Sequence, residues 1–407
     1  MPIEDSTSRQ PPLAGTLVVD LTRVLSGPYC TMLLADMGAR VIKVEQPGTG
    51  DDTRAWGPPF LGEESAYFLS INRNKESLTL DLKHPGACPV IERLLDRADV
   101  LVENFRPGTM DRLGLGYGSL SARWPRLVYC SISGFGQTGP RRSQPGYDAV
   151  IQAEGGLMSI TGDAGGPPFR LGVAISDIVT GMFAAQGVAM ALLARMRTGK
   201  GQHVDVGMLD STAALLTYQA AACFATGRAP GRLGNRHPTI VPYETFEASD
   251  GEFVLAIGND DLWRRFCRLV ELGALASDAR FETNRARVEH YGALRPLLAE
   301  RLRTRTRAAW LAAFTAEGIP CGAVRDVGAV IEDPQIAERG MVETVEHAAL
   351  GDIKVLGIPV KLSDTPGAVR AAPPTLGQHT ERILRTDLGF SDAEIAVLRQ
   401  QRVVGDR

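Results

Sequence analysis

Two aspartates lie where a carboxylate could contact a substrate. Asp163 stands in the segment TGDAGGPP, residues 161–168, whose glycines would let a carboxylate approach a ligand without hindrance from neighbouring Cβ atoms. Asp177 follows a short apolar segment, residues 171–175, that the pattern predicts to be a strand. Each aspartate also has an ordinary structural role, because Asp163 could bond to its own backbone in a turn and Asp177 could cap the helix that follows it.

Several polar segments rich in Pro, Gly, Asn and charged residues lie between predicted strands and helices. In a doubly wound sheet the loops at the carboxyl ends of parallel strands line the ligand crevice, so these segments are expected to converge on one site. Their cations could hold phosphate groups and an aromatic ring could supply an apolar face, which favours a polyanionic ligand. The segments are residues 23–28, 50–60, 72–75 and 103–108, and the side chains considered are Arg73, Lys75, Phe105, Arg106 and Arg112.

A glycine pattern of the GxGxxG type is present without the context of a dinucleotide site. The run GFGQTG, residues 134–139, follows a predicted strand at 127–132, but Pro140 comes next and no helix is expected to open there. We therefore interpret the pattern as a glycine-rich turn. The sequence has no GxSxG motif, no HExxH motif and no histidines at metal-ligand spacing, so no metal site is predicted.

The elements that must position these residues alternate between strands and helices in the N-terminal half. Such alternation predicts βαβ units and an α/β fold with helices on both faces of a parallel sheet. Residues 178–194 are almost uncharged and approach the length of a membrane span, and we interpret them as a helix buried all round in a large protein. Predicted strands are residues 16–21, 40–44, 77–82, 100–102, 127–132 and 203–208, and predicted helices are residues 29–37, 88–97, 109–113 and 210–226.

A change in composition predicts a second, smaller domain. Residues 227–238 are rich in Gly, Pro and Arg and are expected to be a linker. Beyond them the pattern predicts a strand at 252–257 and then three helices, and the last stretch of the chain is expected to hold short strands around 352–355 and a terminal helix. The three helices are predicted at residues 261–272, 294–303 and 308–317.

Composition and charge exclude several classes of function. With 44 Lys and Arg against 47 Asp and Glu, the net charge of −3 excludes a chain-wide basic surface for nucleic acid. Six widely spaced cysteines without a CxxC pair indicate reduced thiols in a cytoplasmic protein and exclude a thiolate zinc site. Residues 1–12 carry acids and no apolar run, which predicts a disordered leader rather than a signal peptide. Neither a membrane nor a nucleic-acid partner is expected.

Long segments in a fixed order resemble the class III CoA-transferases, the family of formyl-CoA transferase, the carnitine CoA-transferases and α-methylacyl-CoA racemase. The resemblance runs from about Leu13 to the C-terminus. The run GDDTRAWGPPF, with NRNK and IVPYETF, most resembles the branch that uses succinyl-CoA and dicarboxylates such as glutarate. The other segments are DLTRVLSGPYCTMLLADMGARVIKVE, NRNKESLTLDL, VENFRPGTMDRLGLGY, GYDAVIQAEGGLMSITG and LGQHT.

The resemblance implies a Rossmann-like large domain built from both ends of the chain, residues 13–226 and 325–407. Residues 227–324 would form the linker and an inserted small α+β domain, and two chains would interlock as a homodimer. Coenzyme A would be a substrate rather than a permanently bound cofactor, and a small carboxylic acid would be the other substrate. The positions implied to contact CoA are Val24, Leu25, Asn72, Lys75, Asn104, Phe105 and Arg112, and the candidates for binding the acid are Arg54, Arg170 and Tyr147.

The resemblance also implies covalent catalysis by an aspartate, which attacks the acyl-CoA thioester to give a mixed anhydride and then an aspartyl-CoA thioester. An ungapped alignment through the TG and PP pairs places the aspartate of the family at Gly165. We therefore predict that the nearby Asp163 is the nucleophile, with Asp177 as the second candidate. Backbone amides of the glycine loop would stabilise the tetrahedral oxyanions.

Two alternatives follow from the same residues. A 2-methylacyl-CoA racemase would use a histidine in a Gly-His-Asp motif, whereas this chain has Tyr147 between Gly146 and Asp148, and a phenol is a poor base near neutral pH. Exchange of deuterium at the α-carbon of a 2-methylacyl-CoA would identify a racemase. A degenerate relative that binds acyl-CoA without turnover is the non-enzymatic alternative, motivated by Gly165.

Overall fold

The computed structural model describes residues 10–405 and divides into two compact units. The first unit comprises the chain up to Leu157, Leu171–Tyr218 and the chain from Pro334 onward, and the second comprises Met158–Arg170 and Gln219–Asp333. Both ends of the chain therefore belong to the first unit. Most of the predicted leader lies outside the described residues, but residues 10–12 lead into a turn in which the Pro11 carbonyl accepts the Ala14 N–H at 3.0 Å.

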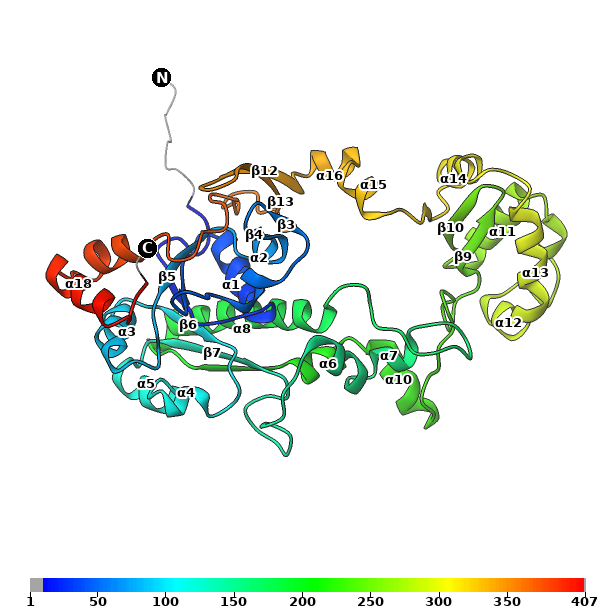
Figure 1. The fold of residues 1–407 in the computed structure, drawn as a ribbon. Coiled ribbons are helices and arrows are strands. Elements are labelled where there is room, and N and C mark those ends of the chain that lie inside the picture. The colour runs from blue at the N-terminus through cyan, green and yellow to red at the C-terminus, as the bar shows by residue number, and fades with distance from the viewer. Residues whose placement is uncertain (1–9, 406–407) are drawn as a thin grey trace, which may run out of the picture. The chain divides into compact units, whose positions relative to one another are not determined.

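A six-stranded parallel sheet forms the centre of the first unit (Figure 1). Its strand order is β5-β2-β1-β6-β7-β8, which is 3-2-1-4-5-6 when its strands are counted along the chain. This is the order of doubly wound sheets, in which the ligand crevice opens where the order reverses, between β1 and β6. The strands are β1 (Leu17–Asp20), β2 (Arg40–Glu45), β5 (Lys75–Thr79), β6 (Val100–Glu103), β7 (Val128–Ser133) and β8 (His203–Gly207).

Helices cover both faces of this sheet because alternate side chains of each strand point to opposite faces. Val19, Leu101 and Tyr129 belong to the apolar cluster on one face, which also contains residues of α3 (Cys88–Leu95), α5 (Tyr117–Arg123) and α18 (Asp392–Gln400). Val18, Val100 and Cys130 belong to the cluster on the other face, with α1 (Ser26–Asp36) and α8 (Ile175–Thr198). The fold is thus α/β, as the alternating pattern predicts.

Helix α8 is long and apolar enough to span a membrane by length and composition, with a mean hydropathy of 1.5 over its most apolar window. It packs on α1 and the sheet through one side, where Ala184, Val188 and Ala191 are buried. Its other side is open: Met190 is 56% exposed and Met196 83% exposed. The prediction of a helix buried all round is therefore wrong for the single chain.

The second unit has its own core. A three-stranded antiparallel sheet, ordered β11-β10-β9, packs with four helices around Trp263 and Trp310, both fully buried. The strands are β9 (Tyr243–Ala248), β10 (Gly251–Ala256) and β11 (Cys321–Ala323), and the helices are α11 (Asp260–Leu269), α12 (Asn284–Glu289), α13 (Tyr291–Leu302) and α14 (Arg307–Ala316). A 3₁₀ turn, Gly273–Ala276, follows α11.

Shorter elements complete the chain. Between β2 and β5 lie a 3₁₀ turn (Asp52–Ala55), the two-stranded sheet of β3 (Phe60–Leu61) and β4 (Glu64–Ser65), and α2 (Ala66–Ile71). A second two-stranded sheet pairs β12 (Val342–His347) with β13 (Gly351–Leu356). The rest are a 3₁₀ turn at Pro85–Ala87, α4 (Thr109–Arg112), α6 (Asp148–Glu154), α7 (Leu157–Ile160), α9 (Met208–Ala214), α10 (Thr217–Thr226), α15 (Val327–Ile331), α16 (Pro334–Glu338), α17 (Thr380–Arg382) and a π-helical turn at Ile383–Asp387.

Three expectations differ from the structure. Residues 171–175 form no strand, and the predicted helix 210–226 is divided into α9 and α10. The unit boundary also lies elsewhere: residues 158–170 join the second unit because they bond to the supposed linker, with Gly234 N–H donating to the Gly162 carbonyl at 3.0 Å and Arg232 donating to the Gly166 carbonyl at 2.6 Å.

Candidate active site

The crevice lies at the carboxyl ends of β1, β2, β6 and β7, where the loops leave the sheet. A cavity of about 680 Å³ is lined by residues following β1, β2 and β6, including Arg23, Phe105 and Arg112. A smaller cavity of about 200 Å³ is lined by Val24, Asp177 and other residues from the loops after β1, β6 and β7. Arg23 and Phe105 line both cavities, so the two adjoin.

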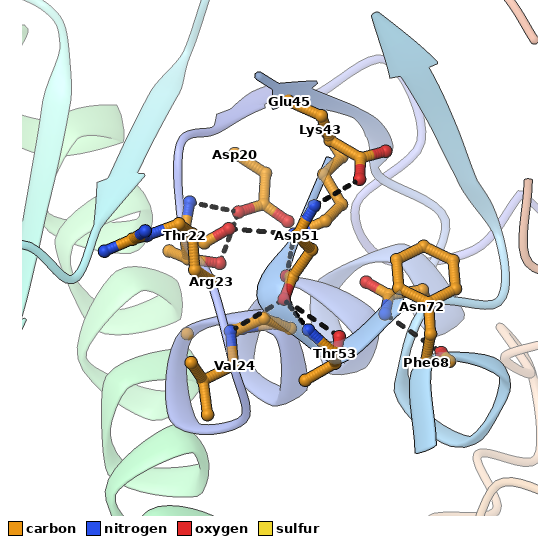
Figure 2. Close-up of polar contacts among 12 residues, drawn as sticks. Asp20, Thr22, Arg23, Val24, Lys43, Glu45, Asp51, Thr53, Phe68 and Asn72 are labelled. Carbon is orange, nitrogen blue, oxygen red and sulfur yellow. Dashed lines mark hydrogen bonds and ion pairs between the residues drawn. The ribbon is translucent and has the colours of Figure 1, made fainter. Parts of the chain in front are cut away.

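The loop after β1 is held by side chains from two neighbouring loops. Asn104, which follows β6, accepts the Arg23 N–H at 2.8 Å and donates to the Arg23 carbonyl at 2.7 Å. Asp51, which follows β2, accepts the Val24 N–H at 3.2 Å (Figure 2). Val24 itself has φ 69°, in the left-handed region that β-branched residues rarely adopt. The loop therefore has a defined and unusual shape.

Buried ion pairs support these loops from beneath (Figure 2). Lys43 on β2 lies 2.8 Å from Asp51, and both side chains are fully buried. Burial would raise the pKa of Asp51, but the Lys43 ammonium and hydrogen bonds from Thr53 outweigh it and lower the pKa to about 2. Asp20, at the end of β1, pairs with Lys75 at 3.2 Å. Asp20 and Asp51 are therefore neutralised by cations.

Asp177 has different surroundings, although it lies in the first turn of α8 and lines the smaller cavity. Burial raises its pKa to about 7, and the nearby Asp148 adds to the rise. Ser26, the first residue of α1, lines the same cavity, and its hydroxyl and backbone N–H lower the pKa of Asp177 and oppose that rise. Asp177 is thus a largely buried carboxyl group, and among the described residues it has no ion pair of the kind that Asp20 and Asp51 form.

Asp148, the first residue of α6, takes the capping role expected of Asp177. One of its carboxylate oxygens accepts the Ser176 N–H at the start of α8 at 2.9 Å, and the other accepts from the Gln152 amide at 2.7 Å. Ala174 occupies the N-cap position of α8 and has no side chain that could cap it. Asp177 is therefore left free of the capping role and available to the cavity.

Asp163 belongs to the second unit and does not line either cavity. It is exposed, and its carbonyl accepts the Gly166 N–H at 3.0 Å in a turn. Gly165 in that turn has φ 75°, a left-handed conformation that glycine adopts without strain. The site in the first unit is built without the residue that the sequence favoured as nucleophile.

Among the positions expected to contact CoA, four line the cavities: Val24, Asn104, Phe105 and Arg112. Arg112 is held at the mouth by a 2.9 Å hydrogen bond to the Thr109 hydroxyl. The guanidinium of Arg23 lies 5.5 Å from the centroid of the Phe105 ring. These side chains combine positive charge with an aromatic face, as a nucleotide-like ligand requires.

Burial removes three of the expected CoA contacts from the surface. Lys75 is fully buried and donates to the Pro28 carbonyl at 2.8 Å and to Asn72 Oδ1 at 3.0 Å; burial lowers its pKa to about 8 despite the pairing with Asp20. Asn72 is also fully buried and donates to the Phe68 carbonyl. Leu25 packs in an apolar cluster. These residues support α1 and the loops, and their contact with CoA stays a prediction.

The residues expected to bind the acid are also divided. Arg54 forms two 2.8 Å hydrogen bonds to the carboxylate of Glu45 and lies over the Phe68 ring, so its guanidinium is already engaged. Tyr147 is 64% exposed and lines the smaller cavity. Arg170 is exposed and belongs to the second unit. The structure of the first unit brings together Tyr147 and Asp177 but neither arginine.

Sequence reasoning missed Ser26 and Asp148 as parts of the site. Ser26 stands in a polar segment that was singled out, RVLSGP, but serine at the start of a helix is usually a cap and gives no functional signal. Asp148 stands in the Gly-Tyr-Asp run that was weighed only as evidence against a racemase. Within residues 10–405 no group of three or more His, Cys, Asp or Glu side chains is arranged to hold a metal ion.

Comparison with known proteins agrees with this architecture. The model of CoA-transferase family III matches residues 13–380. Human succinyl-CoA:glutarate CoA-transferase is 42% identical over 97% of this chain and 90% of its own length, and acetyl-CoA:oxalate CoA-transferase of Acetobacter aceti is 45% identical over 89% of this chain and 92% of its own. The crystal structure of a CAIB/BAIF family protein from Brucella suis has a TM-score of 0.83 and 42% identity, covering 93% of this chain and all of that one. The chain therefore belongs to CoA-transferase family III.

Proposed function

We propose that the protein transfers CoA from an acyl-CoA, with succinyl-CoA as the preferred donor, to a small carboxylic acid, and that Asp177 is the nucleophile. The observation that carries this assignment is the position of Asp177 in the smaller cavity, beside Ser26 and, among the described residues, without an ion-pair partner that would neutralise it. A carboxylate with neutral hydrogen-bond donors keeps its electron pair available, whereas an ion-paired carboxylate does not.

The reaction proceeds in balanced steps. An oxygen of the Asp177 carboxylate attacks the thioester carbonyl carbon, the C–S bond breaks, and CoA leaves as a thiolate, so that a mixed anhydride remains. The thiolate then attacks the Asp177 carbonyl of the anhydride and releases the donor acid, which gives an aspartyl-CoA thioester. The acceptor carboxylate reverses these two steps with itself in place of the donor and leaves as acyl-CoA. No net proton is consumed, and each step exchanges similar groups.

The two adjoining cavities suit the two parts of an acyl-CoA. The larger one, with Arg112, Arg106 and the Phe105 ring, offers the charge and apolar surface that the nucleotide end requires. The smaller cavity, about 200 Å³, is large enough for a short acyl group and too small for the nucleotide. An acyl-CoA lying through both would bring its thioester toward Asp177.

A dicarboxylic acid is our proposed acceptor. The relatives named above act on glutarate and oxalate, which are dicarboxylates. A guanidinium suits a distal carboxylate because it can donate two parallel hydrogen bonds, and the candidates taken from the sequence for that role stay Arg54, which is bonded to Glu45, and Arg170. Transfer from succinyl-CoA should be measured with a panel of mono- and dicarboxylic acids. Activity with monocarboxylates alone would overturn this choice.

We also propose a Rossmann-like cytoplasmic enzyme that works as an interlocked homodimer and needs no permanently bound cofactor. The strand order of the sheet and the six free cysteines support the fold and the reducing compartment. The exposed apolar side of α8 supports an interface with a second copy rather than with a membrane or a nucleic acid.

Paired variants test the nucleophile. Asp177→Asn preserves size and loses the nucleophilic carboxylate, so we expect transfer to fall by about 10³-fold or more, as is common when a covalent nucleophile is lost. Asp163→Asn is the matched variant in the glycine loop and should retain transfer within a few-fold. The opposite pattern, with activity lost at position 163 and kept at 177, would assign the reaction to the glycine loop.

A further inference from the structure

Val24 is a strained residue beside the proposed nucleophile. Its φ of 69° brings a β-branched side chain into the left-handed region, where the Cβ atom crowds the backbone. Such a conformation persists only when the surrounding structure enforces it, and it commonly occurs at functional sites.

The carboxylate of Asp51 is the contact that holds Val24 (Figure 2). Its Oδ1 atom accepts the Val24 N–H at 3.2 Å, the Thr53 N–H at 3.0 Å and the Thr53 hydroxyl at 2.8 Å. Its Oδ2 atom lies 2.8 Å from the Lys43 ammonium. Asp51 is 2% exposed, and the Asp51 N–H in turn donates to Glu45 at 3.0 Å. The contacts with Val24, Thr53 and Lys43 therefore fix the position of the Asp51 carboxylate.

Val24 lies two positions before Ser26, which stands beside the proposed nucleophile. Ser26 is the first residue of α1 and lines the smaller cavity together with Val24 and Asp177, so its N–H and hydroxyl are donors beside the Asp177 carboxylate. The peptide groups after Val24 turn with its φ angle, so a relaxed Val24 would turn the start of α1 and carry the Ser26 donors away from Asp177. The unusual backbone at position 24 therefore sets where the Ser26 N–H and hydroxyl lie relative to the reacting carboxylate.

We propose that Asp51 is a positioning residue for CoA transfer: through Val24 it fixes the start of α1 so that Ser26 holds the Asp177 carboxylate in its attacking orientation. The inference rests on the proposed role of Asp177. Asp51 does not touch the reacting atoms in this account, because it acts by way of the backbone of another residue.

A double-mutant cycle between positions 51 and 24 tests this role. Glycine adopts φ near 70° without strain, so it needs no enforcing contact. In the Val24 background, Asp51→Asn should slow formation of the enzyme–CoA thioester in a single turnover by about 10- to 100-fold, the size of effect expected when a strained residue is released. In the Val24→Gly background the same change should slow it by less than about 3-fold. An equal loss in both backgrounds would overturn the proposal.

Two further variants keep the test decisive. Asp51→Glu retains a negative charge for Lys43 but shifts the carboxylate by one methylene, and it replaces Asp51→Asn if that variant does not fold. It should also slow formation of the thioester more in the Val24 background than in the Val24→Gly background. Asp36→Asn is the matched control, since Asp36 is a buried carboxylate paired with Arg73 at 2.6 Å, at the far end of α1. It should lower the melting temperature without slowing the single turnover.

Failure of this inference can be separated from failure of the proposed function. If Asp177→Asn still forms the thioester adduct, Asp177 is not the nucleophile and the proposed function is wrong. If the adduct requires Asp177 and the effect of Asp51→Asn is independent of residue 24, only the positioning role is wrong.

Discussion

Asp177 lies beside Ser26 in the smaller cavity and is close to a second acid, Asp148, whereas two other buried aspartates of the first unit are paired with cations. Asp20 pairs with Lys75 and Asp51 pairs with Lys43, and in both pairs the side chains are fully buried. An ion pair of this kind contributes to structure and makes a carboxylate a poor nucleophile. Burial and the charge of Asp148 raise the pKa of Asp177 to about 7, and perturbed pKa values of this kind are common at functional sites.

At the residue scale we predict a pH dependence for the transfer reaction. Only the Asp177 carboxylate can attack, so kcat/KM should rise as the pH increases through about 7. Burial is the main reason for the raised pKa, and the charge of Asp148 is the second. Asp148→Asn keeps the size of the side chain and removes that charge, so the inflection of the pH–rate profile should move down by about one unit.

An unshifted pH–rate profile in Asp148→Asn would contradict the electrostatic role of Asp148. An inflection near pH 7 that is unchanged in Asp148→Asn would mean that the charge of Asp148 does not act on the group that titrates. Gln144→Glu is a useful comparison, because residue 144 also lines the smaller cavity and an added negative charge there should move the inflection in the opposite direction.

The free energy of unfolding should also depend on the protonation of Asp177, but it should fall with increasing pH where the activity rises. The folded-state pKa of Asp177 is raised above its ordinary value of 3.8, so its contribution to stability is full below pH 3.8 and is lost as the pH rises through about 7. Asp177→Asn removes this loss, so the variant should be more stable than the native protein at pH 8, by at most roughly 4 kcal/mol. Urea denaturation at pH 5 and pH 8 measures the difference, and an equal effect at both values would contradict it.

The choice between Asp163 and Asp177 illustrates what could not be predicted at this scale. The sequence shows a glycine-rich loop around Asp163, but it does not show that Arg232 and Gly234 bond to that loop and make it part of the second unit. Lys75 is a similar case, since a lysine in a polar segment is usually exposed. Its burial follows from the pairing of β5 with β2, which is a property of the whole sheet.

At the element scale the approach of α8 to α1 decides whether Ser26 reaches Asp177. Gly181, one turn after Asp177 on α8, allows this approach: a Cβ atom there would lie 2.6 Å from the Ser26 carbonyl oxygen and 3.1 Å from the Tyr29 ring. Backbone atoms cannot yield as a flexible side chain can. The glycine therefore has a packing role that outweighs its low helix propensity.

We predict that Gly181→Ala separates the two helices. Alanine usually stabilises a helix interior relative to glycine, but overpacking here should destabilise the protein by about 1–3 kcal/mol. Transfer should fall by about 10-fold or more, since a displacement of about 1 Å between reacting groups can cost that much. Gly118→Ala in α5, where the added Cβ meets open space, is the control and should be neutral or stabilising. A fully active and more stable Gly181→Ala protein would contradict the role.

Strands and helices of the first unit were predictable from local periodicity to within a few residues. The strand predicted at 40–44 is found at Arg40–Glu45, and the one predicted at 100–102 is found at Val100–Glu103. The structure of residues 171–175 was not predictable in this way. Their alternating pattern resembles that of a strand, but they do not pair with a sheet. The ends of some elements depend on distant contacts, such as the cap of α8 by Asp148, and cannot be predicted from the local sequence.

At the scale of the whole molecule, α8 leaves an apolar side without a partner in the single chain. Phe183 is 38% exposed, Leu193 48%, Met182 52% and Met190 56%, and they lie at helical spacing along one side. Such a stripe is rare on a monomer and typical of a protein interface.

We predict that the protein in solution has about twice the 43.7 kDa mass of one chain. Replacing Met190 and Leu193 by lysine should yield monomers in multi-angle light scattering, since two charges would be buried at the interface. Val397→Lys on α18 is the control, because Val397 is equally exposed, at 48%, and lies away from α8. A native protein of single-chain mass would contradict the dimer.

The class of the fold was predictable from the alternation of elements, but the extent of the units was not. The Gly-Pro-Arg composition of 227–238 resembles a linker, yet part of it packs on residues 158–170. A segment of this composition is flexible only when no other segment packs on it, and here Arg232 bonds to Gly166, which lies 66 residues earlier in the chain.

The central claim is that Asp177 carries the CoA thioester, and mapping the adduct tests it most directly. The enzyme should be mixed with succinyl-CoA without an acceptor, quenched in acid and digested, and the modified peptide sequenced by mass spectrometry. We predict a CoA adduct on Asp177 that is absent in Asp177→Asn and is discharged when an acceptor acid is added. An adduct on Asp163, or full turnover by Asp177→Asn, would contradict the account.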